Sequence, residues 1–290
     1  MNRRHFFCSG AAALAAVPLQ ARFAERTGPA RLQLSLAAYS FRDRFAFLKG
    51  RAQEVDGEAM DMFTFLDYCA EHDCGAELTS YFFPPEPADD YLRRIKRHAF
   101  LRAVPICGTA IGNDFSHGDG ERLESEIAAA REWLRRAAVL GAPHVRFFAG
   151  TSRGFAQSEE RYRQAVAALR ACARTAAAQG VFIGIENHGG ITADFLLRLV
   201  REVDSPWVGI NLDSGNFVSD DPYGDFARCA PLAVNVQLKT HVKRGVEADL
   251  PRLIKSLQEV RYQGHVVLEY ESGDAEGEIP GYLDRLRALM

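Results

Sequence analysis

The chain has 290 residues, of which 47% are apolar and 25% charged, so it holds enough apolar material for a large buried core. Its formal net charge is −3 and it carries no basic stripe, so we do not expect nucleic acid as a partner. No run of residues is long and apolar enough to cross a bilayer, so we expect no stable membrane insertion.

The first two dozen residues differ in character from the rest. The adjacent Arg3 and Arg4 and two phenylalanines precede a weakly apolar run and small residues that end at Ala21 or Ala24. This order is typical of a secretory signal, and the paired arginines resemble a twin-arginine export signal. We therefore expect residues 1–24 to be a signal peptide that contacts the export machinery transiently. The expected location is the periplasm of a bacterium, with cleavage after Ala21 or Ala24.

From residue 31 onward, short apolar runs alternate with amphipathic segments. Strands are predicted at 32–39, 76–78, 103–109, 144–148, 181–186, 208–213, 233–239 and 265–270. Helices are predicted at 57–72, 87–102, 119–140, 158–179, 192–203, 222–229, 250–260 and 280–290. Gln263-Gly264 is interpreted as the break before the last strand.

Strict alternation of strand and helix predicts an α/β protein with a parallel sheet. Eight units in about 260 residues match one closed (β/α)₈ TIM barrel domain over residues 31–290. An open doubly wound sheet is the alternative. It would usually carry a glycine-rich phosphate turn after its first strand, and the segment from Ser40 to Asp43 contains none.

Four strands in the second half of the chain carry a metal-binding type of side chain at or near their ends. These side chains are Glu186, Asp213, Gln237 and Glu269. In a parallel barrel, successive strands end on the face where enzymes of this fold place their chemistry. Burying three carboxylates together is very unfavourable unless a cation neutralises them. The pattern therefore predicts a metal site at this face.

Two motifs resemble a known family. Ile185-Glu186-Asn187-His188 and Asp213-Ser214-Gly215-Asn216, together with Glu269, resemble the sugar phosphate isomerase/epimerase family, which has a xylose-isomerase-like TIM barrel. The resemblance covers residues 31–290. That family typically binds one divalent metal ion through Glu, Asp, His and Glu, which implies that Glu186, Asp213 and Glu269 are three ligands.

The fourth ligand departs from the family pattern, because Gln237 stands at the position of the family's histidine. Strand alternation puts Asn235, Gln237 and Lys239 on one face, whereas His241 lies past the expected strand end. We expect Gln237 to be the ligand, with His241 as a substrate contact or the alternative ligand. An oxygen-only shell favours Mn²⁺, with Mg²⁺ or Co²⁺ as alternatives, over Zn²⁺.

Further polar residues near the strand ends are candidates for binding substrate. His188 can bind substrate or shuttle a proton, or it can simply cap the helix that follows. Asn216 can bind a sugar hydroxyl, and Lys239 can stabilise a developing oxyanion. Asn113 follows the third strand and is a fourth candidate. Arg146, inside the fourth strand, needs a partner, and we expect a structural ion pair with Glu77 or Glu186.

These residues favour a metal-dependent isomerase or epimerase that acts through an enediolate on a hydroxy-carbonyl sugar, with Glu186 and Glu269 moving the proton. If a leaving group lies β to that proton, the same site would make a lyase or dehydratase acting on a keto-sugar or keto-glycoside, and export favours this alternative.

Two further classes of protein are less favoured. A DNA-repair endonuclease would need a histidine-rich multi-metal cluster and a basic face, whereas this chain has a net charge of −3. A binding protein would bind its ligand without metal. The expected partner is a small carbohydrate, and a homodimer is the default assembly for such barrels.

Overall fold

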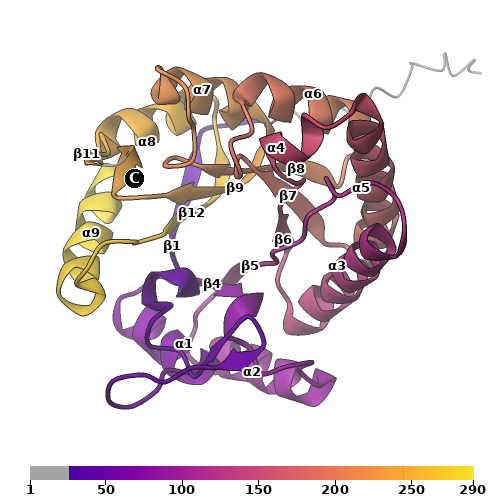
Figure 1. Cartoon of the computed structure of the whole chain (residues 1–290). Helices are drawn as coiled ribbons and strands as arrows, with labels where there is room; N and C mark the ends of the chain where they lie inside the picture. The colour runs from indigo at the N-terminus through magenta and orange to yellow at the C-terminus, as the bar shows by residue number, and fades with distance from the viewer. Residues whose placement is uncertain (1–25, 244) are drawn as a thin grey trace, which may run out of the picture.

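The structure is a computed structural model that describes residues 26–243 and 245–290. Within these residues, eight parallel strands close into a barrel in the order β1-β12-β9-β8-β7-β6-β5-β4 (Figure 1). The strands are β1 (Arg31–Ala37), β4 (Gly75–Thr79), β5 (Ile106–Ala110), β6 (His144–Phe147), β7 (Phe182–Glu186), β8 (Val208–Asp213), β9 (Ala233–Leu238) and β12 (Gln263–Leu268). Strand β1 pairs with both β4 and β12, which closes the barrel and excludes the open sheet. The expected signal peptide lies outside the described residues.

An outer ring of helices surrounds the strands (Figure 1). It consists of α1 (Met62–Glu71), α2 (Asp89–Leu101), α3 (Glu121–Leu140), α5 (Glu159–Gln179), α6 (Ala193–Val203), α7 (Pro222–Cys229), α8 (Leu250–Glu259) and α9 (Ala275–Leu289). Asp61, Ser158 and Thr192 each accept a hydrogen bond from a backbone N–H of the following first turn, which fixes the starts of α1, α5 and α6. Among the described residues, no helix is both long and apolar enough to span a membrane.

Strand alternation divides the barrel into an apolar outside and a polar inside. In β8, Ile210 and Leu212 are fully buried in the main hydrophobic core. The residues between and after them, Asn211 and Asp213, are equally buried but polar, and Asn211 donates a hydrogen bond to Gln237 of β9. The inward positions of these strands therefore supply polar groups to the barrel interior and to its carboxyl end.

The connections between strands and helices hold more structure than the sequence predicted. The additional elements are the hairpin of β2 (Phe47–Leu48) and β3 (Arg51–Ala52), the hairpin of β10 (His241–Lys243) and β11 (Val246–Glu247), the short helix α4 (Ser152–Phe155), and 3₁₀ turns at Ala38–Phe41, Ser80–Phe82 and Ala230–Leu232. Elements of two to four residues are too short to show a hydrophobic period, so pattern reading cannot detect them.

Several predicted boundaries were wrong, for example the start of α1, which is Met62 and not residue 57. Two further errors concern the end of the chain. Gln263 and Gly264 are not a break but the first residues of β12, because Gln263 pairs with Arg31 and its side chain donates to the carbonyls of Thr27 and Pro29. The last helix begins at Ala275, five residues before the predicted start. Its cap is Asp274, which accepts a hydrogen bond from the backbone of Gly277.

Candidate active site

Three acidic side chains lie at the carboxyl ends of strands on one side of the barrel. Glu186 is the last residue of β7, Asp213 is the last residue of β8, and Glu269 directly follows β12. All three are buried, with 4%, 0% and 7% of their surface exposed. The structure thus brings together the three carboxylates that the sequence singled out, at the face where this fold carries its chemistry.

Burial raises the pKa of all three carboxyl groups, because the charged form loses its hydration. The largest opposing effect on Glu186 comes from Arg146, and the largest on Asp213 and Glu269 comes from Lys239. The carboxylates also raise one another's pKa by repulsion. Ionisation of this group near neutral pH therefore depends on the positive charge beside it.

Glu186 is held from two sides. Its Oε2 lies 2.9 Å from the Nε atom of Arg146 in a buried ion pair, and its Oε1 accepts a hydrogen bond of 2.8 Å from Nδ2 of Asn216. Arg146 is itself fixed, because its Nη1 donates to the carbonyl of Ile111 and its guanidinium stacks 4.1 Å from the ring centroid of Phe148. The expected ion pair of Arg146 is therefore with Glu186 rather than with Glu77.

Lys239 supplies the positive charge beside the other acidic side chains of the site. Its Nζ atom lies 3.4 Å from Oδ2 of Asp213, 3.7 Å from Oε1 of Glu269 and 3.0 Å from Oε2 of Glu271. Oδ1 of Asp213 accepts a hydrogen bond from the backbone of Gly215, whereas the buried Oδ2 has only the ammonium group of Lys239 beside it. Among the described residues, this oxygen is held by an ion pair and not by an aligned hydrogen bond.

Gln237 lies in a hydrogen-bonded network that fills the barrel interior. Its Oε1 accepts from Nδ2 of Asn211 at 2.5 Å, and its Nε2 donates to Oε1 of Glu77 at 2.7 Å. Asn235 donates to the other oxygen of Glu77, and burial raises the pKa of Glu77 to about 7. Both polar ends of Gln237 are thus engaged, and its carbonyl oxygen retains only its second lone pair for a metal.

The donor chemistry at the strand ends fits a hard divalent ion. Glu186, Asp213 and Glu269 supply carboxylate oxygens, the donor type that Mn²⁺ and Mg²⁺ prefer, and Oδ2 of Asp213 is held only by the ion pair with Lys239. Among the described residues, no three acidic, His or Cys side chains already stand in a metal-binding arrangement. The ammonium group of Lys239 supplies the positive charge between them, so an ion would have to displace it toward Glu271.

The two histidines predicted near the site lie at its edge. His188 stacks on Phe148 with ring centroids 4.1 Å apart, and partial burial together with Arg146 lowers its pKa to about 4, which keeps the imidazole neutral. It does not cap helix α6, because Thr192 does so. His241 lies in β10, exposed, with Nδ1 3.0 Å from the hydroxyl of Thr240.

Asn113 is placed differently from a free substrate-binding amide. It is 5% exposed, and its Nδ2 and Oδ1 atoms bond the backbone carbonyl and N–H of Phe148. Glu271, which pairs with Lys239, was not among the predicted site residues. Because Glu271 lies two residues beyond Glu269, strand alternation would have put the two on the same side.

The profile of the family described as xylose isomerase-like TIM barrel matches residues 66–289. The chain belongs to this family. The resemblance inferred from the strand-end motifs is therefore confirmed. No curated protein matches the chain by sequence.

Solved structures show the same fold at low sequence identity. D-psicose 3-epimerase from Clostridium cellulolyticum H10 has a TM-score of 0.72 and 15% identity, over 89% of this chain and 99% of that chain. A 3-keto-D-glucoside 4-epimerase from E. coli has a TM-score of 0.69 and 17% identity, over 89% and 100%. The probable 3-DHS dehydratase of Bacillus anthracis has a TM-score of 0.67 and 17% identity, over 88% and 98%. At these identities the likeness establishes the fold alone.

Proposed function

We propose that the protein is a sugar isomerase or epimerase that acts through an enediolate on a hydroxy-carbonyl sugar. The observation that carries this proposal is the pair Glu186 and Glu269, two buried carboxylates at the ends of β7 and β12 that are close enough for Glu186 to raise the pKa of Glu269. The family, and the epimerases among its structural relatives, support the same class of reaction.

In this reaction one carboxylate removes the proton from the carbon next to the substrate carbonyl, and the electron pair of the C–H bond passes to the carbonyl oxygen. Return of a proton by the other carboxylate, on the opposite face, inverts that carbon. Return by the same carboxylate to the neighbouring carbon exchanges aldose and ketose. Arg146 and Asn216 hold Glu186 in position for its part in either outcome.

The remaining charged groups stabilise and orient the substrate. Lys239 places its ammonium group beside Asp213 and Glu269, where negative charge on a substrate oxygen would be stabilised. Glu186, Asp213 and Glu269 would hold a divalent ion, Mn²⁺ being the expected one, and the ion would supply polarisation of the carbonyl. His188, neutral and stacked on Phe148, can hydrogen-bond a sugar hydroxyl at the rim.

The proposal is tested with Glu186→Gln and Glu269→Gln, which keep the shape of each side chain but remove the base. Each variant should lose at least about 10³-fold in kcat and should no longer exchange the substrate's C–H proton with deuterated solvent. Glu259→Gln, on the outer helix α8, is the control and should behave as wild type. Near-normal turnover by both site variants would rule out this mechanism.

A second candidate uses the same proton abstraction but a different ending. If a hydroxyl or glycosidic oxygen lies β to the abstracted proton, the electron pair expels it, and the enzyme is a dehydratase or lyase on a keto-sugar or keto-glycoside. The likeness to a probable dehydratase and to a keto-glucoside epimerase favours testing it. Product mass separates the two, because isomerisation leaves the mass unchanged and elimination releases water or an aglycone.

We also propose that residues 1–24 direct export to the periplasm. The adjacent Arg3 and Arg4 and the small residues before Ala24 support this proposal. Changing both arginines to lysine should leave the protein in the cytoplasm with its N-terminus uncleaved, as read by fractionation and N-terminal sequencing. Export of that double variant at the wild-type level would contradict a twin-arginine signal.

A further inference from the structure

A cavity of 410 Å³ lies directly beside the carboxylate group. It is lined by Gly215 and Asn216 after β8, by Lys239, Thr240, His241, Lys243 and Gly245 between β9 and β11, and by Glu271 and Ser272 after β12. Its volume falls within the range of about 300–1,000 Å³ that small-molecule sites occupy. Asn216, Lys239 and Glu271 line both this cavity and the candidate active site, whereas Glu186, Asp213 and Glu269 do not line the cavity, which therefore opens beside the reacting centre.

Two side chains form the boundary between the compartment and the carboxylates. Asn216 donates to Glu186 and its Oδ1 lies 3.4 Å from Nζ of Lys239, while Lys239 reaches Asp213. A molecule that reacts at the carboxylates and extends past this boundary must enter the cavity. The close approach of the walls requires glycine at position 215, because a Cβ atom there would lie 2.6 Å from Cδ of Lys239.

The lining selects for a hydroxyl-rich group. None of the nine lining residues is a Leu, Ile, Val, Met, Phe, Tyr or Trp, and the one aromatic ring is the imidazole of His241. Thr240 links the wall, because its hydroxyl lies 3.0 Å from Nδ1 of His241 and 3.3 Å from Oγ of Ser272. Within the described residues, Nε2 of His241 has no hydrogen-bond partner and remains available to a ligand. The many hydrogen-bond donors and acceptors of this lining favour a sugar ring, whose hydroxyl groups can bond to them. An aromatic or aliphatic aglycone would leave these donors and acceptors without partners.

The charges disfavour a phosphate group. Lys239 already faces the carboxylates of Asp213, Glu269 and Glu271, and the carboxylate of Glu271 stands in the cavity wall itself. A phosphate dianion would meet this carboxylate with one described lysine, Lys243, left to attract it. A neutral sugar ring meets no such repulsion.

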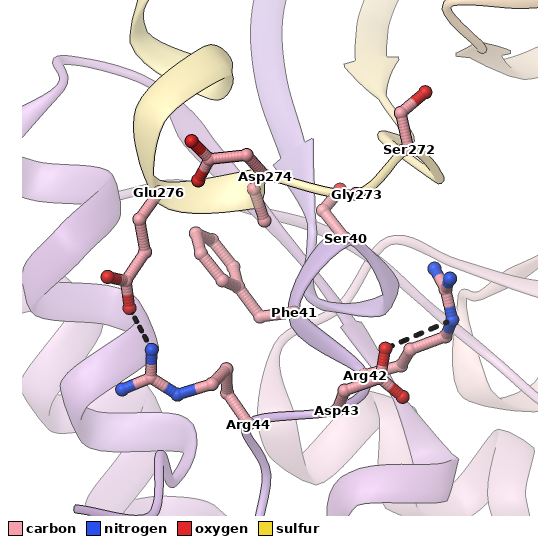
Figure 2. A pocket seen from close by; sticks show the side chains of 10 residues that line it. Ser40, Phe41, Arg42, Asp43, Arg44, Ser272, Gly273, Asp274 and Glu276 are labelled. Atoms are coloured by element: carbon pink, nitrogen blue, oxygen red, sulfur yellow. Dashed lines mark hydrogen bonds and ion pairs between the residues drawn. The ribbon is translucent and has the colours of Figure 1, made fainter. Parts of the chain in front are cut away.

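A smaller cavity of 210 Å³ shares Ser272 but offers fewer free groups (Figure 2). Four of its five charged side chains form ion pairs, Arg44 with Glu276 and Arg42 with Asp43, and the fifth, Asp274, accepts from the backbone of Gly277 at the start of α9. Of these two cavities, we therefore take the larger as the candidate ligand site.

We propose that the 410 Å³ cavity binds the second sugar ring of a keto-glycoside, so that the substrate of this enzyme is a glycoside rather than a free or phosphorylated monosaccharide. This inference rests on the proposed function. The glycosidic bond would cross the boundary formed by Asn216 and Lys239, with the oxidised ring at the carboxylates and the second ring against His241 and Ser272.

The kinetic test compares a keto-glucoside whose aglycone is one methyl group with the same keto-glucoside carrying a glucosyl group. Wild type should show a kcat/KM at least about tenfold higher for the glucosyl compound. His241→Ala and Ser272→Ala should each reduce this ratio by about 3- to 10-fold, the loss expected for one hydrogen bond. Ser256→Ala, the same chemical change on the outer helix α8, should leave the ratio at its wild-type value.

Binding is measured separately by calorimetry with the unoxidised parents, methyl glucoside and maltose, which cannot react. Tighter binding of maltose that weakens in His241→Ala and Ser272→Ala supports the second-ring site even if neither keto-compound is turned over, because binding in the cavity and reaction at the carboxylates are measured separately. Equal binding and equal turnover of the two sizes, or a preference for the phosphorylated monosaccharide that is lost in Lys243→Ala, would overturn the inference.

Discussion

The two mouths of the barrel contain buried ionisable groups whose pKa values shift in opposite directions. At the carboxyl ends of the strands, burial raises the pKa of Glu186, Asp213 and Glu269. At the amino ends, burial lowers the pKa of His144 to about 4 and also lowers that of His265. In each place the protein interior favours the neutral form.

Counter-charges make the difference between the two mouths. Arg146 and Lys239 lie beside the carboxylates. His144 has no counter-charge of this kind. Its Nδ1 lies 2.8 Å from the carbonyl oxygen of Cys107, and its Nε2 has no hydrogen-bond partner among the described residues. The cavity of 310 Å³ at this end is lined mainly by apolar and neutral groups, such as Phe182. Burial alone therefore does not make a reactive site. The paired cations give the carboxyl end its chemistry.

Removing the central cation should have the largest effect. Lys239→Met leaves Asp213, Glu269 and Glu271 without their shared ammonium, so we expect a loss of about 3 kcal/mol in the free energy of unfolding in metal-free buffer, together with loss of turnover. Added Mn²⁺ should raise the melting temperature of this variant more than that of wild type. Lys255→Met on the surface of α8 is the control. Wild-type stability of Lys239→Met would show that the ammonium does not compensate the carboxylates.

The opposite mouth should make the protein sensitive to acid. The pKa of His144 is about 4 in the folded chain and about 6.5 when unfolded, so the unfolded state takes up the proton first. Stability is therefore complete above pH 6.5 and falls as the pH drops toward 4, by up to about 3 kcal/mol. The positive charges of His265 and Arg146 also lower the pKa of His144.

Urea unfolding at pH 7 and pH 5 measures this effect. His144→Gln should unfold with a smaller difference between the two pH values than wild type does. His72→Gln, at the outer end of α1, should retain the wild-type difference. An unchanged difference in His144→Gln would assign the acid sensitivity to other groups.

The smallest expected effect concerns the departure from the family's ligand set. Gln237→His restores the imidazole and should tighten Mn²⁺ binding by about tenfold, while the loss of the bond to Glu77 lowers stability by about 1 kcal/mol. Calorimetric titration with Mn²⁺ measures the first effect and urea unfolding the second. Gln258→His, on the outside of α8, should change neither. Unchanged or weaker Mn²⁺ binding in Gln237→His would indicate that position 237 acts in the interior network only.

Much of this molecule could be predicted from its sequence, because barrel strands are nearly continuous apolar runs and their inward ends are polar. Glu186, Asp213 and Lys239 follow from strand position and alternation alone. The hydrogen bond from Gln237 to Glu77 could not be predicted, because Glu77 lies on another strand of the barrel, 160 residues away in sequence. The choice between the two predicted partners of Arg146 depended on which strand lies next to β6. That strand is β7, which carries Glu186, whereas β4, which carries Glu77, pairs with β5 and β1.

The closure of the barrel by β1 and β12 also decides where the molecule can be joined to something else. The side chain of Gln263 bonds the carbonyl of Thr27 at the start of the described chain, and Arg287, near the end of α9, bonds the carbonyl of His72 at the amino-end face. Both ends therefore lie on the face opposite the carboxylates. A tag or surface linker attached at Met290 would hold the protein with its substrate entrance facing outward, and a short peptide joining the two ends would suit a circularly permuted enzyme.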